Sequence, residues 1–335
     1  MNKVAAYARL LRIPGLGGLA IPIVIGAITV NPGLDIYSLL ILFTIGALAS
    51  IYGFVLNDYI DIGVDKLSKE LRGRPLISGE ISPQTAVGIS CFCVIFAFLF
   101  IFVLFYGEVI EGFRFAAILC IVIAWLLASI YDFYGKKIAG SDFLVALSVS
   151  FVFLFGALSI GKPTLFTWII FLLTFNNLLH MNAVEGGIKD ADHDYLMGVK
   201  NIALSSGVKV DGNKIFIPLH FKSFGMIIRI SSSILLIAPF VFYGVNFYSW
   251  QIVVLIIAII GVLYFSVKLL SIKTFDRNII RKYIAMQSFL RYSLVPIMLI
   301  STIGLLYSII LIIFPIGWYI LFTPLLGEKL FKPKM

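Results

Sequence analysis

Runs of about 20 apolar residues recur along the chain, and they restrict its fold more than any other feature. A helix of roughly 20 mainly apolar residues is long enough to cross the hydrocarbon core of a bilayer. Only 13% of the residues are charged and 61% are hydrophobic, whereas a soluble domain carries about 25% charged residues. Too few polar side chains remain to cover a water-facing globule, so lipid is the solvent that suits most of this surface.

We therefore predict an all-α fold, a polytopic membrane bundle of about nine transmembrane helices that forms a single domain over residues 1–335. A further apolar stretch, Pro315 to Leu326, is too short for a full span, and a re-entrant, an interfacial or a shortened tenth helix would each fit it. The predicted spans are residues 14–31, 38–57, 86–106, 115–131, 143–160, 165–185, 226–246, 250–271 and 293–313.

Basic residues gather in alternate loops between these spans, which predicts an integral, multi-pass protein with a cytoplasmic N-terminus. The net charge of +9 is spread over these loops, where it sets orientation and contacts anionic membrane lipid, so no nucleic-acid partner is expected. The basic side comprises the N-terminus, residues 66–74, Lys136 with Lys137, residues 189–229 and residues 268–291, whereas the opposite loops hold Arg114 and Lys162.

The longest polar stretch, residues 185–225, is predicted to be an extended cytoplasmic loop within the single domain. Alternating residues on both sides of Asp211-Gly212 predict a β-hairpin inside this loop.

A first acidic cluster ends the second predicted span. Asn57 precedes Asp58, Asp61 and Asp65, whose spacing of three and four residues puts the three carboxylates on one face of a helix. Like charges at this spacing repel by about a few tenths of a kcal/mol per pair. Hard divalent cations reverse this cost, because Mg²⁺ takes carboxylate oxygens together with water and phosphate.

A second acidic cluster ends the sixth predicted span. Asp190 and Asp194 are four residues apart and share a helix face, whereas Asp192 points elsewhere. Both clusters follow even-numbered spans and are expected on the same, cytoplasmic side of the membrane. Two acidic helix ends that each hold a Mg²⁺ ion would form a receptor for a diphosphate, although solvated helix ends are the simpler interpretation of either cluster alone.

Basic and polar residues accompany the clusters. The cations are candidates to neutralise a diphosphate or to act only as topological charges. Asn182, inside the sixth span, is a candidate for acceptor binding or for a hydrogen bond between helices. The cations are Arg72 and Arg74 after the first cluster, Lys136 and Lys137 after the fourth span, and Lys200 after the second cluster.

The sequence resembles the UbiA superfamily of intramembrane prenyltransferases. Asn57-Asp58-x-x-Asp61-x-x-x-Asp65, with the continuation Arg74-Pro75-Leu76-x-Ser78-Gly79, is similar to the first aspartate motif of that family. Asp190-x-x-x-Asp194 is similar to the second motif, and Tyr131 with Lys136 and Lys137 resembles its Tyr–Lys motif. The chain departs at Asn201, where many members carry threonine, and at Ser141, often asparagine.

The resemblance implies a Mg²⁺-dependent polyprenyl transferase that uses two ions. One ion would be held by Asp58, Asp61 and Asp65 and the other by Asp190 and Asp194, so that the metals stabilise the departing diphosphate. Tyr131 or Tyr134 would stabilise the allylic cation through its ring face. The expected partners are a polyprenyl diphosphate donor, a small hydrophobic or amphipathic acceptor and membrane lipid.

Other functions fit parts of the pattern. A cation-coupled membrane transporter would use the same acids, although transporter acids tend to lie nearer the middle of a span. A lipid-binding scaffold would not need intact aspartate clusters. For the enzyme, an aromatic quinone precursor and a glycerol-phosphate ether lipid are the favoured acceptors, and phosphoribosyl compounds and porphyrin-derived alcohols are further acceptor classes implied by the resemblance.

Overall fold

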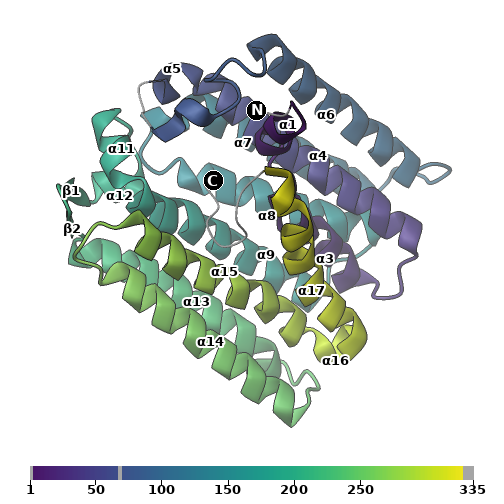
Figure 1. Ribbon diagram of the computed structural model, residues 1–335. Helices are drawn as coiled ribbons and strands as arrows, with labels where there is room; N and C mark the ends of the chain where they lie inside the picture. Colours follow the sequence, from purple (N-terminus) through teal and green to yellow (C-terminus); the bar gives the residue numbers. More distant parts are fainter. Residues whose placement is uncertain (1–2, 67–69, 327–335) are drawn as a thin grey trace. The chain divides into compact units, whose positions relative to one another are not determined.

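The computed structural model describes residues 3–66 and 70–326 (Figure 1). Within this part of the chain, nine helices or helical series are long and apolar enough to cross a membrane. The protein is therefore a multi-pass, all-α membrane protein, as predicted. The candidate spans are Lys3–Val30, Ile36–Ile60, Pro83–Leu104, Phe113–Lys137, Asp142–Ile160, Leu165–Lys189, Leu219–Phe242, Ser249–Leu270 and Leu305–Leu326.

The chain divides into two compact units. Unit 1 takes its described residues from segments 1–133, 152–162 and 313–335, and unit 2 consists of segments 134–151 and 163–312. The helix α8 (Asp142–Ile160) contributes residues to both units.

Unit 1 is built on the long helix α4, which packs along α6 and also contacts α2 and α3. Near the chain's end, the Trp318 Nε1 atom donates a hydrogen bond of 2.8 Å to the Ile13 carbonyl, so α17 is tied to α2. The helices of unit 1 are α1 (Lys3–Leu10), α2 (Ile13–Leu19), α3 (Ile21–Val30), α4 (Ile36–Ile60), α5 (Ile62–Asp65), η1 (Glu70–Gly73), α6 (Pro83–Leu104), α7 (Phe113–Tyr134), part of α17 (Leu305–Phe322) and η4 (Thr323–Leu326).

Polar caps fix where the long helices begin. The Asp35 carboxylate accepts the Ser38 amide hydrogen bond at 2.9 Å at the start of α4. Ser82 accepts from the Thr85 amide at 3.1 Å in front of α6, whose first residue is Pro83. A side-chain oxygen at the cap satisfies an amide that has no partner within the helix, and proline suits the first helical position.

Two glycines let α3 and α8 approach closely within unit 1. A Cβ atom at Gly26 would overlap the carbonyl oxygen of Phe153, and one at Gly156 would overlap the carbonyl oxygen of Ile23. Small residues at a helix interface allow this backbone contact in membranes, where packing rather than water drives association.

Unit 2 is a second helical group in which α14 packs against α15, and α13 packs against α9 and α14 (Figure 1). Its elements are η2 (Gly135–Lys137), α9 (Leu165–Leu179), the π-helix η3 (His180–Gly186), α10 (Gly187–Lys189), α11 (Ala191–Leu196), α12 (Ile202–Ser205), β1 (Lys209–Asp211), β2 (Lys214–Phe216), α13 (Leu219–Phe242), α14 (Ser249–Leu270), α15 (Arg277–Met298) and α16 (Ile300–Ile303).

The predicted ninth span, residues 293–313, is wrong in its position. The run is divided among α15, α16 and α17, and Gly304 interrupts it with a φ of 84°. That conformation is available to glycine at little cost. The ninth apolar helix therefore begins at Leu305 and includes the stretch Pro315 to Leu326, which the sequence left undecided.

Residues 187–218, between two spans, are folded. Three short helices are followed by the predicted hairpin, in which β1 and β2 pair antiparallel with Asp211 opposite Lys214. The hairpin is fastened to the segment before α15, because the Ile215 amide donates to the Lys273 carbonyl at 3.0 Å and the Phe275 amide donates to the Asn213 carbonyl at 2.8 Å. Helix α13 starts at Leu219, earlier than the predicted residue 226.

Candidate active site

The first aspartate site, defined as Asp58, Asp61 and Asp65, lies where α4 ends. Asp61 keeps helical backbone angles at the C-cap of α4, and the Asp65 amide donates to the Asp61 carbonyl at 2.8 Å. The chain thus continues by one more turn into α5, and the three acids lie along one side of the helical path, as predicted. All three are buried, with 8%, 6% and 2% of their surfaces exposed.

Two arginines hold the carboxylates of this site. Arg74 Nη1 lies 3.1 Å from Asp58 Oδ1 and 2.6 Å from Asp65 Oδ2, so one guanidinium bridges two acids seven residues apart. Arg12 Nη2 lies 3.4 Å from the same Asp58 oxygen. The sequence predicts Arg74 as a cation that binds diphosphate, and the structure places it against Asp58 and Asp65. The sequence did not link Arg12 to Asp58.

Arg12 has an unusual backbone conformation, with φ 49° and ψ 39° in the left-handed region. A residue other than glycine rarely adopts it, and such strain concentrates at functional sites. The Arg12 guanidinium lies 4.3 Å from the centre of the Phe54 ring, one turn before Asp58 on α4. The cation–π contact and the ion pair together hold the strained residue in place.

Asn57 and Asp132 add a second layer to the first site. The Asn57 Nδ2 atom donates a hydrogen bond of 3.3 Å to Asp132 Oδ1, which joins α4 to α7. Asp132 is buried, with 8% of its surface exposed. Tyr131, the predicted ring-face residue, precedes it in α7 and is half-buried.

The second aspartate site, Asp190 and Asp194, lies in unit 2 between α10 and α11. The Asp194 amide donates to the Asp190 carbonyl at 2.8 Å, so the two acids are one helical turn apart, as predicted. Lys189 Nζ lies 3.2 Å from Asp190 Oδ2. Asn201 Nδ2 donates to Asp194 Oδ2 at 2.7 Å. Asn201, which stands where many UbiA-like sequences carry threonine, therefore contacts the second site directly.

Burial and the neighbouring Asp190 carboxylate raise the pKa of Asp194 to about 7, against the opposite effects of Lys136, Asn201 and Lys189. Lys136 is therefore close enough to the second site for its charge to act on Asp194. The Lys200 amide donates to the Lys136 carbonyl at 2.9 Å, so the chain segments that carry both lysines meet beside Asp194.

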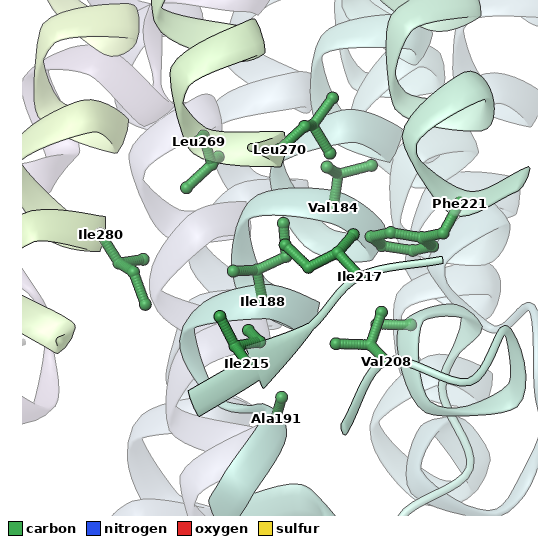
Figure 2. Close-up of a cluster of buried hydrophobic side chains, with 11 residues drawn as sticks. Val184, Ile188, Ala191, Val208, Ile215, Ile217, Phe221, Leu269, Leu270 and Ile280 are labelled. Carbon is green, nitrogen blue, oxygen red and sulfur yellow. The ribbon is translucent and has the colours of Figure 1, made fainter. Parts of the chain in front are cut away.

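An apolar cluster anchors the second site (Figure 2). Ile188 and Ala191, which flank the helical turn of Asp190, are fully buried and contribute to this cluster. Ile215 and Ile217 from the hairpin region pack into it as well. The hairpin therefore packs against the same apolar cluster as the residues on either side of Asp190. The other members of the cluster are Val184, Ala203, Val208, Phe221, Leu269, Leu270 and Ile280.

A buried ionic network precedes the second site, and sequence reasoning missed its partners. Glu185, in the π-helix η3, accepts hydrogen bonds from Arg229 Nη2 at 2.8 Å and from Arg291 Nη1 at 3.0 Å. Arg229 also contacts His180 Nδ1 at 2.8 Å and Gln287 Oε1 at 3.1 Å. π-Helical turns are frequent at functional sites, and this one ends four residues before Asp190.

The sequence predicts both arginines of this network as loop charges. For Arg229 this prediction is wrong, because Arg229 lies inside α13 with 2% of its surface exposed. One signal in the sequence was available. Glu185 is an acid at the end of a predicted span, and an intramembrane acid normally needs a basic partner.

The remaining predicted residues have other contacts. Asn182 Nδ2 donates to the Leu178 carbonyl at 2.9 Å within its own helix. Lys137 Nζ lies 5.9 Å from the centre of the Tyr134 ring. Arg72 is exposed on η1. Asp192, which helical spacing predicts on a different face from Asp190 and Asp194, accepts a hydrogen bond from Arg277 Nη2 at 2.7 Å.

Residues 19–294, which include both aspartate sites, match the model of the UbiA prenyltransferase family. The chain belongs to the UbiA prenyltransferase family. It is therefore an enzyme that transfers prenyl groups, and the resemblance stated from its motifs is confirmed.

Curated UbiA relatives act on different acceptors. The chain is 28% identical over 219 residues to the 4-hydroxybenzoate octaprenyltransferase of Francisella tularensis subsp. novicida, covering 63% of this chain and 73% of the relative. It is 26% identical over 275 residues to the digeranylgeranylglyceryl phosphate synthase of Methanocaldococcus jannaschii, covering 82% of this chain and 87% of the relative.

Solved structures share the UbiA fold. A structure described as digeranylgeranylglyceryl phosphate synthase in membranes has a TM-score of 0.62 at 22% identity, over 95% of this chain and 100% of that chain. A UbiA homolog from Archaeoglobus fulgidus bound to GPP and Mg²⁺ has a TM-score of 0.59 at 18% identity, over 85% of this chain and 96% of that chain.

The carboxylate oxygens of this chain suit a hard divalent cation whose coordination shell is completed by the substrate. Within residues 3–66 and 70–326, no three acidic, histidine or cysteine side chains already converge as a metal cage. Mg²⁺ does not require such a cage, because it is usually held by one or two carboxylates with waters and substrate phosphates. Buried carboxylates at the first site and the turn of two aspartates at the second both meet that requirement.

Proposed function

We propose that this UbiA enzyme transfers a polyprenyl group from a polyprenyl diphosphate to a membrane-associated acceptor, in a Mg²⁺-dependent reaction that releases diphosphate. The proposal rests chiefly on the first aspartate site, where three buried carboxylates lie beside two arginines at the end of a membrane-spanning helix. Burying so many charges is costly unless a ligand uses them.

Each aspartate site would hold one Mg²⁺ ion. Asp58, Asp61 and Asp65 are proposed ligands of one ion, and Asp190 and Asp194 of the other. When bound, the metals would supply positive charge to the diphosphate oxygens and so make diphosphate a better leaving group. The A. fulgidus homolog that holds GPP and Mg²⁺ supports Mg²⁺ as the metal that accompanies a prenyl diphosphate.

The chain's cations would bind the diphosphate that leaves. We assign this role to Arg74, Arg72, Lys136, Lys137 and Lys200, of which Arg74 already lies against Asp58 and Asp65 of the first site. The carbon–oxygen bond of the donor breaks, diphosphate leaves with the electron pair, and the acceptor's nucleophilic atom attacks the allylic cation and loses a proton. Tyr131 would stabilise that cation, a contribution of about 0.5–2 kcal/mol.

The acceptor is proposed to carry an anionic group. The curated relatives are named for 4-hydroxybenzoate, an aromatic carboxylate, and for a glyceryl phosphate product. Asn182 and Asn57 are the uncharged polar candidates for contacts to substrate. Each CH₂ group of the prenyl tail removed from water contributes about 0.8 kcal/mol, so we propose that the donor enters from the lipid. We propose that both aspartate sites face the cytoplasm.

A direct assay tests the proposal. The purified protein in bilayer nanodiscs receives labelled geranylgeranyl diphosphate with 4-hydroxybenzoate or with a geranylgeranylglyceryl phosphate, in Mg²⁺ or in EDTA. We expect a prenylated product by mass spectrometry and stoichiometric diphosphate, both lost in EDTA and in Asp61→Ala and Asp190→Ala. Asp35→Asn, which removes a carboxylate from the other end of α4 but keeps a good helix cap, should retain activity.

Two outcomes would reject the proposal. One is full turnover in both aspartate variants. The other is uptake of a solute into proteoliposomes with no chemical change in the solute, which is the behaviour of a cation-coupled transporter.

A further inference from the structure

Asp132 has a buried carboxylate that its surroundings do not satisfy. Its Oδ1 atom accepts one hydrogen bond, from Asn57 at 3.3 Å. Its Oδ2 atom is buried and has no hydrogen-bond partner among the described residues. Since a carboxylate offers about four acceptor positions, most of the binding capacity of Asp132 is unused.

A carboxylate in this state is expensive to keep in a membrane helix. Burial of an ionised carboxylate costs several kcal/mol unless hydrogen bonds or a counter-ion compensate. A single long hydrogen bond from a neutral amide offsets only part of this cost. Asn57 serves as the only described hydrogen-bond partner of this side chain, so structural stability alone is a poor reason for an acid at this position.

The position of Asp132 gives a better reason. Asn57, to which it is bonded, immediately precedes Asp58 in α4, and Asp132 is close enough to Asp61 and Asp58 to interact with their negative charges. Arg12 and Arg74 contact Asp58 and Asp65 and offset part of the charge of the four acids. A fourth carboxylate next to three others increases their repulsion, and a bound divalent cation turns this repulsion into attraction.

We propose that Asp132 is a fourth carboxylate of the first aspartate site, directed by Asn57 toward the divalent cation bound there. The inference rests on the proposed function, in which that site binds Mg²⁺. Asp132 acts as a metal-site residue through its unused oxygen, either on the ion itself or on a water molecule of the ion. Outer partners of a metal site commonly change its affinity by about 10–100-fold when they are removed.

The test is Asp132→Asn, which keeps the shape of the side chain and removes its charge. Mg²⁺ is titrated into the full-length protein in detergent micelles by isothermal calorimetry, and thermal unfolding is followed with EDTA and with Mg²⁺. We expect Mg²⁺ affinity to fall by about tenfold or more, and the rise in Tm caused by Mg²⁺ to shrink. In EDTA the Tm should stay constant or rise, because an uncompensated buried charge has gone.

Controls separate this inference from the function on which it rests. Asp61→Asn should weaken Mg²⁺ binding, and Asp35→Asn, at the opposite end of α4, should leave it unchanged. Asp132→Glu should restore part of the affinity. Wild-type Mg²⁺ affinity in Asp132→Asn, with affinity lost in Asp61→Asn, would overturn the role of Asp132 alone. Unchanged affinity in both variants would overturn the metal site itself, and a lower Tm in EDTA with an unchanged Mg²⁺ response would show a purely structural role.

Discussion

At the scale of single residues, Asn201 shows how one side chain holds the Asp194 carboxylate in place. The Asn201 amide nitrogen donates to Asp194, and its oxygen accepts from the Leu204 amide at 2.8 Å as the cap of α12. The side chain is therefore held at both ends, and it fixes the orientation of the carboxylate.

The raised pKa of Asp194 predicts a pH effect on the metal-free protein. Its folded pKa of about 7 is above its ordinary value, so between about pH 4 and pH 7 the folded state binds more protons than the unfolded state. By linkage, this group makes the protein less stable as pH rises through that window. Asp194→Asn should therefore flatten the dependence of Tm on pH in EDTA.

Thermal unfolding of wild type and Asp194→Asn at pH 5, 6 and 7 checks this sign. The Tm of the wild type should fall relative to that of the variant as pH rises. Asn201→Ala removes a hydrogen bond that lowers this pKa and should move the window to higher pH. Parallel Tm curves for wild type and Asp194→Asn would contradict the assignment.

At the scale of helices, close backbone contact and buried charge are the two features on which packing depends. The contact of α3 with α8 requires the absence of a side chain at Gly156, whereas a Cβ atom at Gly53 in α4 would meet nothing within 4 Å. Both glycines lie inside long helices, where alanine is intrinsically better by about 1 kcal/mol. The space around each glycine therefore decides whether its replacement by alanine stabilises or destabilises the protein.

Gly156→Ala should lower the Tm, because the new methyl group overlaps the Ile23 carbonyl and separates the two helices. Gly53→Ala should leave the Tm unchanged or raise it, since the better helix propensity meets no clash. Thermal unfolding of both variants in the same detergent provides the comparison. Equal Tm changes in the two variants would mean that α3 and α8 are not in close contact.

The ionic network of η3, α13 and α15 predicts that loss of a buried arginine costs more stability than loss of an exposed one. In Arg229→Ala the Glu185 carboxylate, 1% exposed, loses its closest partner. Removing one member of a buried pair costs about 3–5 kcal/mol. Arg114→Ala breaks the pair of Arg114 with Glu108, whose side chains are 35% and 53% exposed, and such surface pairs contribute at most about 1 kcal/mol.

Chemical unfolding of the two arginine variants measures this difference. Arg229→Ala should also weaken Mg²⁺ binding at the second aspartate site, because η3 runs directly into α10 and Asp190. A loss no larger than that of Arg114→Ala would show that the network contributes little.

At the scale of the whole molecule, local patterns predict most of the fold. The lengths of the apolar runs predict eight of the nine candidate spans. Helical spacing predicts the turn that joins the aspartates at each site. Both patterns can be read from the sequence because they depend on neighbouring residues. The ninth span was misplaced, since the backbone break at Gly304 leaves no mark in hydropathy. Arg12, Arg229 and Asp132 acquire their roles from partners at least 44 residues away, and no local pattern contains that information.

The central proposal is that aspartates of both sites are needed for Mg²⁺-dependent binding of diphosphate. Binding of inorganic diphosphate in the presence of Mg²⁺, measured by calorimetry on wild type, Asp61→Asn, Asp190→Asn and the double variant, tests it most directly. Residues that act on one ligand show non-additive effects in such a cycle. We predict that each single change weakens binding strongly and that the second change adds little. Effects of the two changes that add independently, or binding unaffected by either, would contradict the account.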